Sequence, residues 1–314
     1  MKQINSFILS AILLLSASCG GKQTGTTATT KPDGNAIVLR LQGSFAIGGT
    51  VITQPGTYNT QQPFKADGQT LHGDHAYVSY QIPDSARRFL MVFLHGAGQS
   101  AKTWESTPDG REGFSTIFLR RHFGTYLIDQ PRRGRAGRST VSEQVIAASL
   151  SALCDTLGGS ILITHSQGGG PGWHTAIRSR NVKAIVSYEL GSGFFFPESE
   201  TPEPLETISP FGALSATPIP MDDFMKLTRI PIIIYYGDYI PDEPSDNWAM
   251  DSWRVRLKMA QLFAECINRH GGDATVVHLP EQGIKGNSHF LFAEKNNVQI
   301  ANLLSDWLKE KGLD

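Results

Sequence analysis

The sequence predicts an α/β protein in which a mostly parallel sheet is covered by helices on both faces. Short apolar runs alternate with segments of helical period, and several of these runs are apolar without a break. One such run, Phe89 to Leu94, ends at a glycine-containing turn, as expected for a strand buried on both faces. The 314 residues, 40% of them hydrophobic, are enough for one large core.

The predicted elements follow one another in a regular order. An antiparallel start is expected from strands at Ile37 to Leu41 and Ala76 to Ile82, with glycine-rich turns between them. The later strands are expected at 89–94, 125–128, 160–164, 182–188, 230–236 and 274–279. The helices are expected at 114–123, 141–157, 173–180, 253–269 and 298–311. The domain is therefore predicted to occupy residues 37–314.

One segment interrupts this alternation. Residues 191–227 have no clear period and are too long for a plain connection in a compact domain. Their apolar side chains predict a lid or cap insertion; a surface excursion without function is the alternative. Phe194 and Phe195 are expected to contact the substrate, although they could merely pack the lid down.

Charge and composition exclude several classes of protein. The 28 lysines and arginines nearly balance the 29 aspartates and glutamates, which argues against a dedicated nucleic-acid binder. No cysteine and histidine cluster has the spacing of a structural zinc site, and we expect neither a metal nor a cofactor. Cys154 and Cys266 lie among apolar neighbours and are expected as buried free thiols, although an oxidising compartment would allow them to pair.

The N-terminus predicts export. Residues 1–18 combine a positive start, an apolar run at 7–15 and a small-residue ending, as in a signal peptide. The run is shorter than the ~20 residues of a membrane span. Its small-small-Cys ending resembles a bacterial lipobox, so Cys19 is expected to carry a lipid that anchors the protein in the cell envelope; plain secretion is the alternative. Residues 19–36 are expected to form a flexible tether.

A nucleophile is predicted where the strand at 160–164 ends. Thr164 to Gly168 (THSQG) follows this strand and leads into a glycine-rich helix start. The segment resembles the G-x-S-x-G nucleophile elbow, with Thr164 in place of the first glycine. Small residues are needed there because the serine backbone is strained and the helix packs close to the strand. Ser166 is the expected nucleophile, and His165 is expected to serve packing.

An oxyanion loop is predicted at the end of the strand at 89–94. His95 to Gly98 (HGAG) resembles the HGGG-type loop of lipases and esterases, whose small residues let backbone N–H groups approach a developing oxyanion. The expected donors are the N–H groups of Ala97 and Gln167, with Gly98 beside the substrate.

The general base is expected near the C-terminus. Of His270, His278 and His289, only His289 lies in a loop between the last predicted strand and the last helix, so it is the preferred candidate. The carboxylate that orients it is open between two residues. Asp238 follows the strand at 230–236, and Glu189 follows the strand at 182–188.

Three further blocks make a family resemblance specific. They are Trp104 to Arg111 (WESTPDGR), Asp129 to Arg135 (DQPRRGR) and Gly283 to His289 (GIKGNSH). With the elbow and the HGAG loop, they resemble a group of secreted bacterial serine esterases of the α/β-hydrolase superfamily. The resemblance implies the α/β-hydrolase fold and a glutamate as triad acid, which favours Glu189 over Asp238.

Several residues near these motifs have simpler interpretations. Trp104 and Glu105 are expected to brace the oxyanion loop. Four arginines after the strand at 125–128 are expected to pair with nearby carboxylates, although they could bind an acidic substrate group; they are Arg132, Arg133, Arg135 and Arg138.

The leading hypothesis is a serine ester hydrolase that acts on a small-molecule or glycan ester through an acyl-enzyme. A peptidase, a thioesterase or an acyltransferase would use the same triad, and a non-catalytic surface-binding lipoprotein is a further alternative. A dinucleotide-binding fingerprint at Gly168 to Gly170 is disfavoured, because the glycine that it requires three residues further on is Trp173. The sequence leaves the oligomeric state open.

Overall fold

The computed structural model describes residues 36–62, 64–136 and 142–314. The chain divides into two units, Met1–Ala36 and Ile37–Asp314, of which the second is described below. The predicted signal peptide, Cys19 and Arg138 lie outside the described residues. Within the described part of the chain, no helix combines the length and the apolar character that a membrane span needs.

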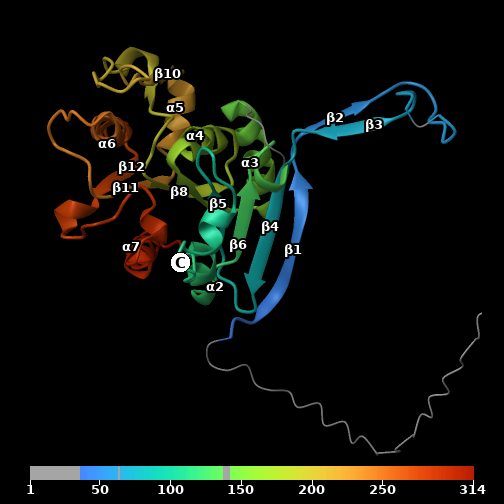
Figure 1. Ribbon diagram of the computed structural model, residues 1–314, viewed down its shortest axis with the longest axis horizontal. Helices are drawn as coiled ribbons and strands as arrows, with labels where there is room; N and C mark the ends of the chain where they lie inside the picture. Colours follow the sequence, from blue (N-terminus) through green and yellow to red (C-terminus); the bar gives the residue numbers. More distant parts are fainter. Residues whose placement is uncertain (1–35, 63, 137–141) are drawn as a thin grey trace, which may run out of the picture. The chain divides into compact units, whose positions relative to one another are not determined.

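The unit is built on an eight-stranded sheet (Figure 1). In spatial order its strands are β1 (Leu39–Ile47), β4 (Ala76–Pro83), β6 (Thr125–Asp129), β5 (Leu90–Leu94), β7 (Ser160–His165), β8 (Val182–Tyr188), β11 (Pro231–Tyr236) and β12 (Asp273–His278). The pairs β1–β4 and β4–β6 are antiparallel, and all the others are parallel. The predicted α/β-hydrolase architecture, with a mostly parallel sheet after an antiparallel start, is confirmed.

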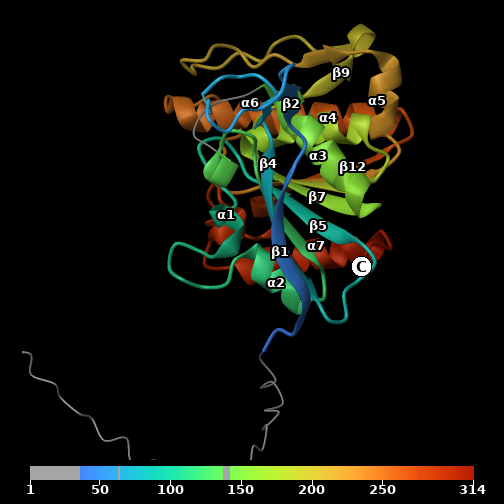
Figure 2. The same cartoon turned by 90° about the vertical axis from the view of Figure 1, so that its right-hand side faces the viewer.

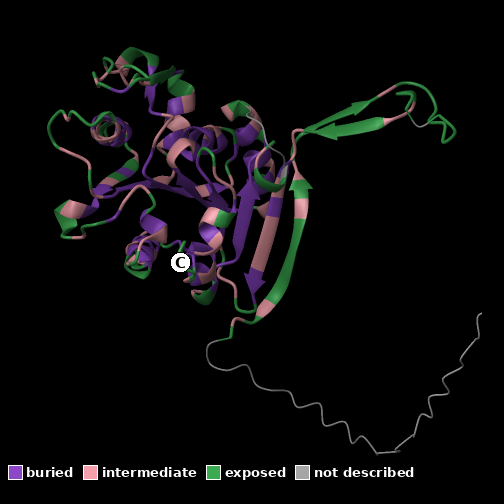
Figure 3. Ribbon diagram, viewed as in Figure 1, coloured by how far each residue is buried: buried purple, intermediate pink, exposed green. Residues whose placement is uncertain are grey.

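Helices cover both faces of the sheet (Figure 2). They are α1 (Lys102–Glu105), α2 (Phe114–Arg120), α3 (Glu143–Leu157), α4 (Gly169–Arg178), α5 (Met221–Leu227), α6 (Trp248–Arg269) and α7 (Asn297–Glu310). Alternate residues of the central strands enter different cores. On β7, Leu162 packs with the apolar faces of α3, α4 and α6, whereas Ile161 and Ile163 pack with those of α2 and α7. This two-sided burial explains why the strands are continuously apolar in sequence (Figure 3).

The sequence did not indicate a hairpin that follows β1. Its strands β2 (Thr50–Thr53) and β3 (Thr70–Gly73) pair antiparallel and extend away from the rest of the unit, and every residue in them is exposed (Figures 1 and 3). Because the hairpin contributes nothing to the core, its strands lack the alternation of apolar and polar residues that predicts a half-buried strand.

The irregular segment at 191–227 has an apolar anchor. Its strand β9 (Phe195–Pro197) pairs in parallel with β10 (Thr217–Ile219), and both precede α5, next to α4 and α6 (Figure 2). Phe194 and Phe195 are only 2% and 1% exposed and belong to the hydrophobic core. These two side chains therefore anchor the segment in the core. Their contact with a substrate stays a prediction.

The remaining short elements lie around the ends of the strands. They are the 3-10 turns η1 (Gly134–Ala136), η2 (Ser166–Gly168), η3 (Glu198–Glu200), η4 (Leu279–Gln282) and η5 (Leu291–Ala293).

Candidate active site

Ser166 stands on a sharp turn between β7 and α4. Its φ of +54° is unusual for a residue other than glycine, and such strain is typical of functional sites. A Cβ on Gly96 would lie 3.0 Å from the Ser166 Cβ, and a Cβ on Gly191 would lie 3.2 Å from the Ser166 Oγ. The two glycines therefore leave room for the serine and for a reactant beside it.

The helix that follows packs equally close to its neighbours. A Cβ on Gly169 would lie 2.1 Å from a side-chain carbon of Leu190, and one on Gly172 would lie 2.8 Å from a methyl carbon of Thr164. The glycines at the start of α4 are thus needed because side chains there would clash with neighbouring atoms, as the elbow motif predicts.

Glu189 and His289 are in contact. Glu189 directly follows β8, has a φ of +50° and is 2% exposed. Its Oε2 lies 3.3 Å from the Nδ1 of His289, and its Oε1 accepts a 2.6 Å hydrogen bond from the N–H of Gly237. One carboxylate oxygen is held by the backbone while the other faces the imidazole ring.

Asp238 is placed differently. Its two oxygens accept hydrogen bonds from the backbone N–H groups of Tyr239 and Gly286, at 2.8 and 2.9 Å. These bonds, that of Gly286 first, lower the pKa of the Asp238 carboxyl. Among the described residues, Asp238 forms no ion pair with a histidine. It fastens the loop that carries His289 instead.

The His289 ring lies between two other rings. Its centroid is 4.5 Å from the ring centroid of His165 and 4.5 Å from that of Trp253 on α6. Its side chain is 27% exposed, so it is open on one side. No hydrogen bond joins His289 to the Ser166 hydroxyl within the described residues. In unliganded active sites such bonds are often long and tighten only when substrate binds.

The HGAG segment begins at a buried histidine and continues into an exposed turn. Ala97 and Gly98 are exposed, and Gly98 has a φ of +68°. His95 is fully buried, and its Nδ1–H donates to the Gly96 carbonyl at 2.8 Å. Its Nε2 accepts a 3.3 Å hydrogen bond from the N–H of Gln130. Burial lowers the pKa of His95, so a neutral ring holds the loop.

Two backbone N–H groups are expected as oxyanion donors. Within the described part of the chain, the backbone N–H groups of Ala97 and Gln167 donate to no other residue. Unpaired N–H groups at a nucleophile are the donors that an oxyanion hole needs.

His165 does more than pack. It is fully buried, and its Nε2–H donates a 3.0 Å hydrogen bond to the carbonyl oxygen of His289. Its Nδ1 accepts a 3.1 Å hydrogen bond from the side-chain amide of Gln99, whose oxygen lies 3.4 Å from the N–H of Gly96. Desolvation, then repulsion from His289, holds the pKa of His165 well below its usual range. No sequence pattern indicates a role for Gln99.

The loop after β6 pairs with carboxylates. Arg132 forms an ion pair with Asp74, and Arg135 lies 3.2 Å from Glu105. Arg133 is half-buried. Trp104 is completely buried and packs on Phe292, with ring centroids 4.1 Å apart. Arg132 and Arg135 thus form the carboxylate pairs that the simpler interpretation expects. Arg133 forms no such pair among the described residues, and its buried Nε has no hydrogen-bond partner there.

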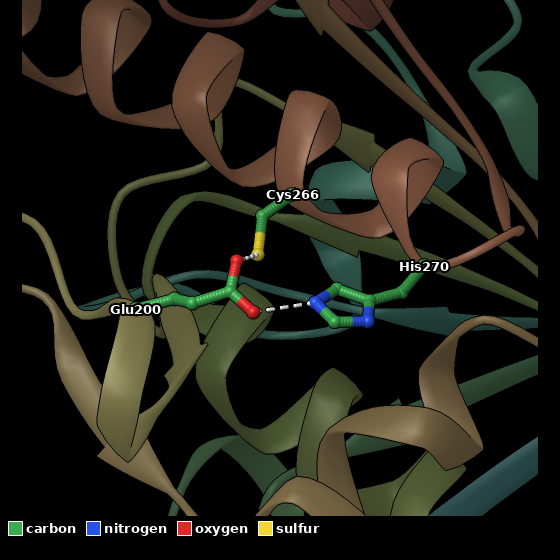
Figure 4. Close-up of side chains that lie close together, drawn as sticks. All are labelled: Glu200, Cys266 and His270. Atoms are coloured by element: carbon green, nitrogen blue, oxygen red, sulfur yellow. Dashed lines mark hydrogen bonds and ion pairs between the residues drawn. The ribbon is translucent and has the colours of Figure 1, made fainter.

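One cluster has the residue types of a metal site. Glu200, Cys266 and His270 bring one ligand atom each within 4.8 Å of one another (Figure 4). The Glu200 carboxylate is already paired with His270 at 2.7 Å and with Arg269 at 2.9 Å. Burial raises the pKa of the Cys266 thiol to about 11, so this sulfur is protonated at neutral pH. The cluster is an ion-pair network that joins η3 to the end of α6.

Both cysteines of the described residues are free and buried, as expected. Cys154 lies on α3 and Cys266 on α6.

The strands, the strained serine and the paired carboxylate and imidazole define an α/β hydrolase of the esterase and lipase type. Residues 91–302 match the alpha/beta hydrolase family, and the chain belongs to this family. It is 28% identical to a protein whose structure is described as that of a novel bacterial esterase. That match covers 89% of this chain and 98% of the other, with a TM-score of 0.66.

Two other proteins extend the comparison. The chain is 25% identical to a probable secreted lipase, phiG, of a fungal species (strain ATCC 74256), over 75% of this chain and 86% of the lipase. An esterase from Thermogutta terrifontis shares 15% identity with a TM-score of 0.50, over 85% of this chain and 98% of its own, and this likeness shows the fold alone.

Proposed function

We propose that the protein is a serine ester hydrolase in which Ser166, His289 and Glu189 form the catalytic triad. The contact between Glu189 and the His289 Nδ1 carries this proposal, because it places an ionisable carboxylate behind the ring. With Nδ1–H directed at Glu189, the Nε2 of His289 is left to accept a proton from the serine.

The reaction would proceed in two stages. His289 removes the Ser166 proton while the serine oxygen attacks the ester carbonyl, and the resulting imidazolium protonates the departing alcohol. Water then attacks the acyl-enzyme with His289 again as base, which releases the acid and restores Ser166. Glu189 stays ionised and stabilises the imidazolium.

The N–H groups of Ala97 and Gln167 would stabilise the negative oxygen of each tetrahedral intermediate. Ala97 lies in the HGAG turn, which His95 holds through its bond to the Gly96 carbonyl. Gln167 lies in η2, directly after β7, whose last residue His165 is hydrogen-bonded to Gln99. A fixed donor pair gains catalytic strength because it needs no reorganisation when charge develops.

Fluorophosphonate labelling tests the proposal directly. The domain from Gly20 onward is treated with the reagent, and the adduct is located by intact mass and peptide mapping, with turnover of short-chain p-nitrophenyl esters measured in parallel. One adduct on Ser166, lost together with turnover in Ser166→Ala, is the expected result. A protein that neither labels nor turns over would contradict the proposal and favour a binding protein on a hydrolase scaffold.

We propose further that the protein is exported and attached to the cell envelope by a lipid on Cys19. The support is the sequence of residues 1–19 and the likeness to a relative named as a secreted lipase. Expression in a bacterium with and without an inhibitor of lipoprotein signal peptidase tests this. Without the inhibitor the mature N-terminus should carry a diacylglycerol mass. A cleaved but unlipidated protein would contradict the anchor.

A further inference from the structure

Arg256 on α6 holds the segment beside the nucleophile. Its Nε donates to the carbonyl oxygen of Gly191 at 3.2 Å, and its Nη1 donates to the carbonyl oxygen of Ser252 at 2.8 Å and to the Ser252 hydroxyl. The residue is half-buried. Its guanidinium is therefore fixed in position before any ligand arrives.

The position is close to both proposed catalytic groups. Gly191, which Arg256 binds, is the residue whose Cβ would lie 3.2 Å from the Ser166 Oγ. On the other side, the Arg256 guanidinium carbon lies 5.2 Å from the ring centroid of Trp253, and the Trp253 ring packs on His289. Gly191 thus lies between Arg256 and Ser166, and the Trp253 ring contacts both Arg256 and His289.

Arg256 differs from the other two arginines of α6 in its ion pairs. Among the described residues, no carboxylate lies within ion-pair distance of it, whereas Arg254 pairs with Asp251 at 2.7 Å and Arg269 pairs with Glu200 at 2.9 Å on the same helix. All its protein acceptors are carbonyl and hydroxyl oxygens, and its Nη2 donates to no described residue. Burial lowers the pKa of Arg256, because the half-buried guanidinium has lost part of its hydration.

We propose that Arg256 is a specificity-determining residue that binds a carboxylate group carried by the ester substrate. The proposal rests on the hydrolase function proposed above and adds the chemical class of its substrate. A guanidinium with a free Nη2 can donate charge-assisted hydrogen bonds to a carboxylate, and these are stronger than neutral ones. A half-buried, uncompensated cation also gains more from an anion than a fully hydrated one does.

Matched pairs of esters test the proposal. Monomethyl succinate and methyl succinamate carry a carboxylate or an amide on the acyl side, and O-acetylglycolate and O-acetylglycolamide carry them on the alcohol side. Each is tested as a substrate by acid release and as a competitor of fluorophosphonate labelling, so binding is measured even where turnover is slow. In at least one pair, the carboxylate should be preferred by about 10-fold or more in kcat/KM or in protection.

Variants connect the preference to the side chain. Arg256→Gln keeps a donor for the Gly191 carbonyl but removes the charge, and the carboxylate-to-amide ratio should fall to about 1. Arg256→Lys should keep part of the preference because it keeps the charge but loses the planar donor set. Lys258→Gln removes an exposed positive charge from the same helix and should leave the ratio unchanged. Circular dichroism confirms that each variant is folded.

The outcomes separate the two proposals. If the protein labels with fluorophosphonate but shows no carboxylate preference in either pair, Arg256 is a structural clamp on Gly191 and the inference is wrong. The same holds if the preference survives Arg256→Gln. If Ser166 does not label at all, the hydrolase proposal itself fails, and the inference fails with it.

Discussion

The Nε2–H of His165 donates a 3.0 Å hydrogen bond to the carbonyl oxygen of His289, a residue 124 positions further along the chain. The residue before the proposed nucleophile thereby fixes the backbone of the residue proposed as base. Because the carbonyl can only accept, this bond also assigns the proton of His165 to Nε2, and Nδ1 is left to accept from Gln99.

Replacing this histidine should loosen the base. His165→Phe keeps a ring in the buried site but leaves the His289 carbonyl and the Gln99 amide without partners. Losing buried hydrogen bonds of this kind costs about 1–3 kcal/mol of unfolding free energy. We expect kcat to fall about 10-fold or more, because small misplacements of catalytic groups have large effects.

Urea unfolding and p-nitrophenyl ester kinetics measure both effects. His165→Gln offers an amide donor to the His289 carbonyl and should recover part of the lost kcat. A His165→Phe variant with unchanged kcat would show that the bond does not position His289.

The two carboxylates near His289 should differ sharply on substitution. Glu189→Gln keeps the shape of the side chain but removes the charge that stabilises the imidazolium, and kcat should fall by about 10³–10⁴-fold. Asp238→Asn weakens acceptors for the N–H groups of Tyr239 and Gly286 and should lower kcat less than about 10-fold. Saturation kinetics of both variants give the ranking. The opposite ranking would make Asp238 the triad acid.

A methyl group on Gly191 should block the nucleophile. The Cβ of Gly191→Ala would lie 3.2 Å from both the Ser166 Oγ and the Ser166 carbonyl carbon, and the backbone atom cannot move aside easily. We expect fluorophosphonate labelling to slow at least 10-fold, because a displacement of catalytic groups by about 1 Å can lower a rate by about 10²-fold.

Gly73→Ala is the matched control, since a Cβ there would meet no atom within 4 Å. Labelling of Gly191→Ala at the wild-type rate would contradict the close approach of these two residues.

The sequence predicted the sheet and named most residues of the candidate site, because each of these features rests on a local pattern. Ser166 lies in an elbow motif, and His289 lies in a loop between a strand and a helix. The choice between Glu189 and Asp238 could not be made from strand positions, because β8 and β11 are neighbours in the sheet and both end at the same edge. Two observations distinguish them structurally: the contact of Glu189 with the His289 Nδ1, and the bonds that Asp238 accepts from Tyr239 and Gly286.

Other contributors are invisible in the sequence for a physical reason. Trp253 and Arg256 lie on α6, where the helical period identifies a buried face but not what that face meets. Gln99 is one polar residue in a turn. Their roles depend on packing between segments that are distant in the sequence, as in the bond from Arg256 to Gly191, two residues 65 positions apart.

The ion-pair network at Glu200 should make stability depend on acid pH. Hydrogen bonds from Arg269, then from His270, lower the pKa of the Glu200 carboxyl in the folded protein. A lowered folded-state pKa means that the unfolded chain binds a proton more readily. The network therefore contributes its stability at pH values above the ordinary glutamate pKa of about 4.3 and loses it as the pH falls through the lower folded-state value.

Urea unfolding of the wild type and of Glu200→Gln between pH 7 and pH 3 measures this contribution. Glu200→Gln should be less stable at pH 7, and the gap should close as the pH drops below about 4. Glu198→Gln removes an exposed carboxylate from the same turn and should show no such gap. The charge of Glu200 is lost as its carboxyl is protonated, so a stability difference that comes from this charge must shrink at low pH. A difference that stays constant down to pH 3 would therefore show that the charge of Glu200 does not stabilise the fold.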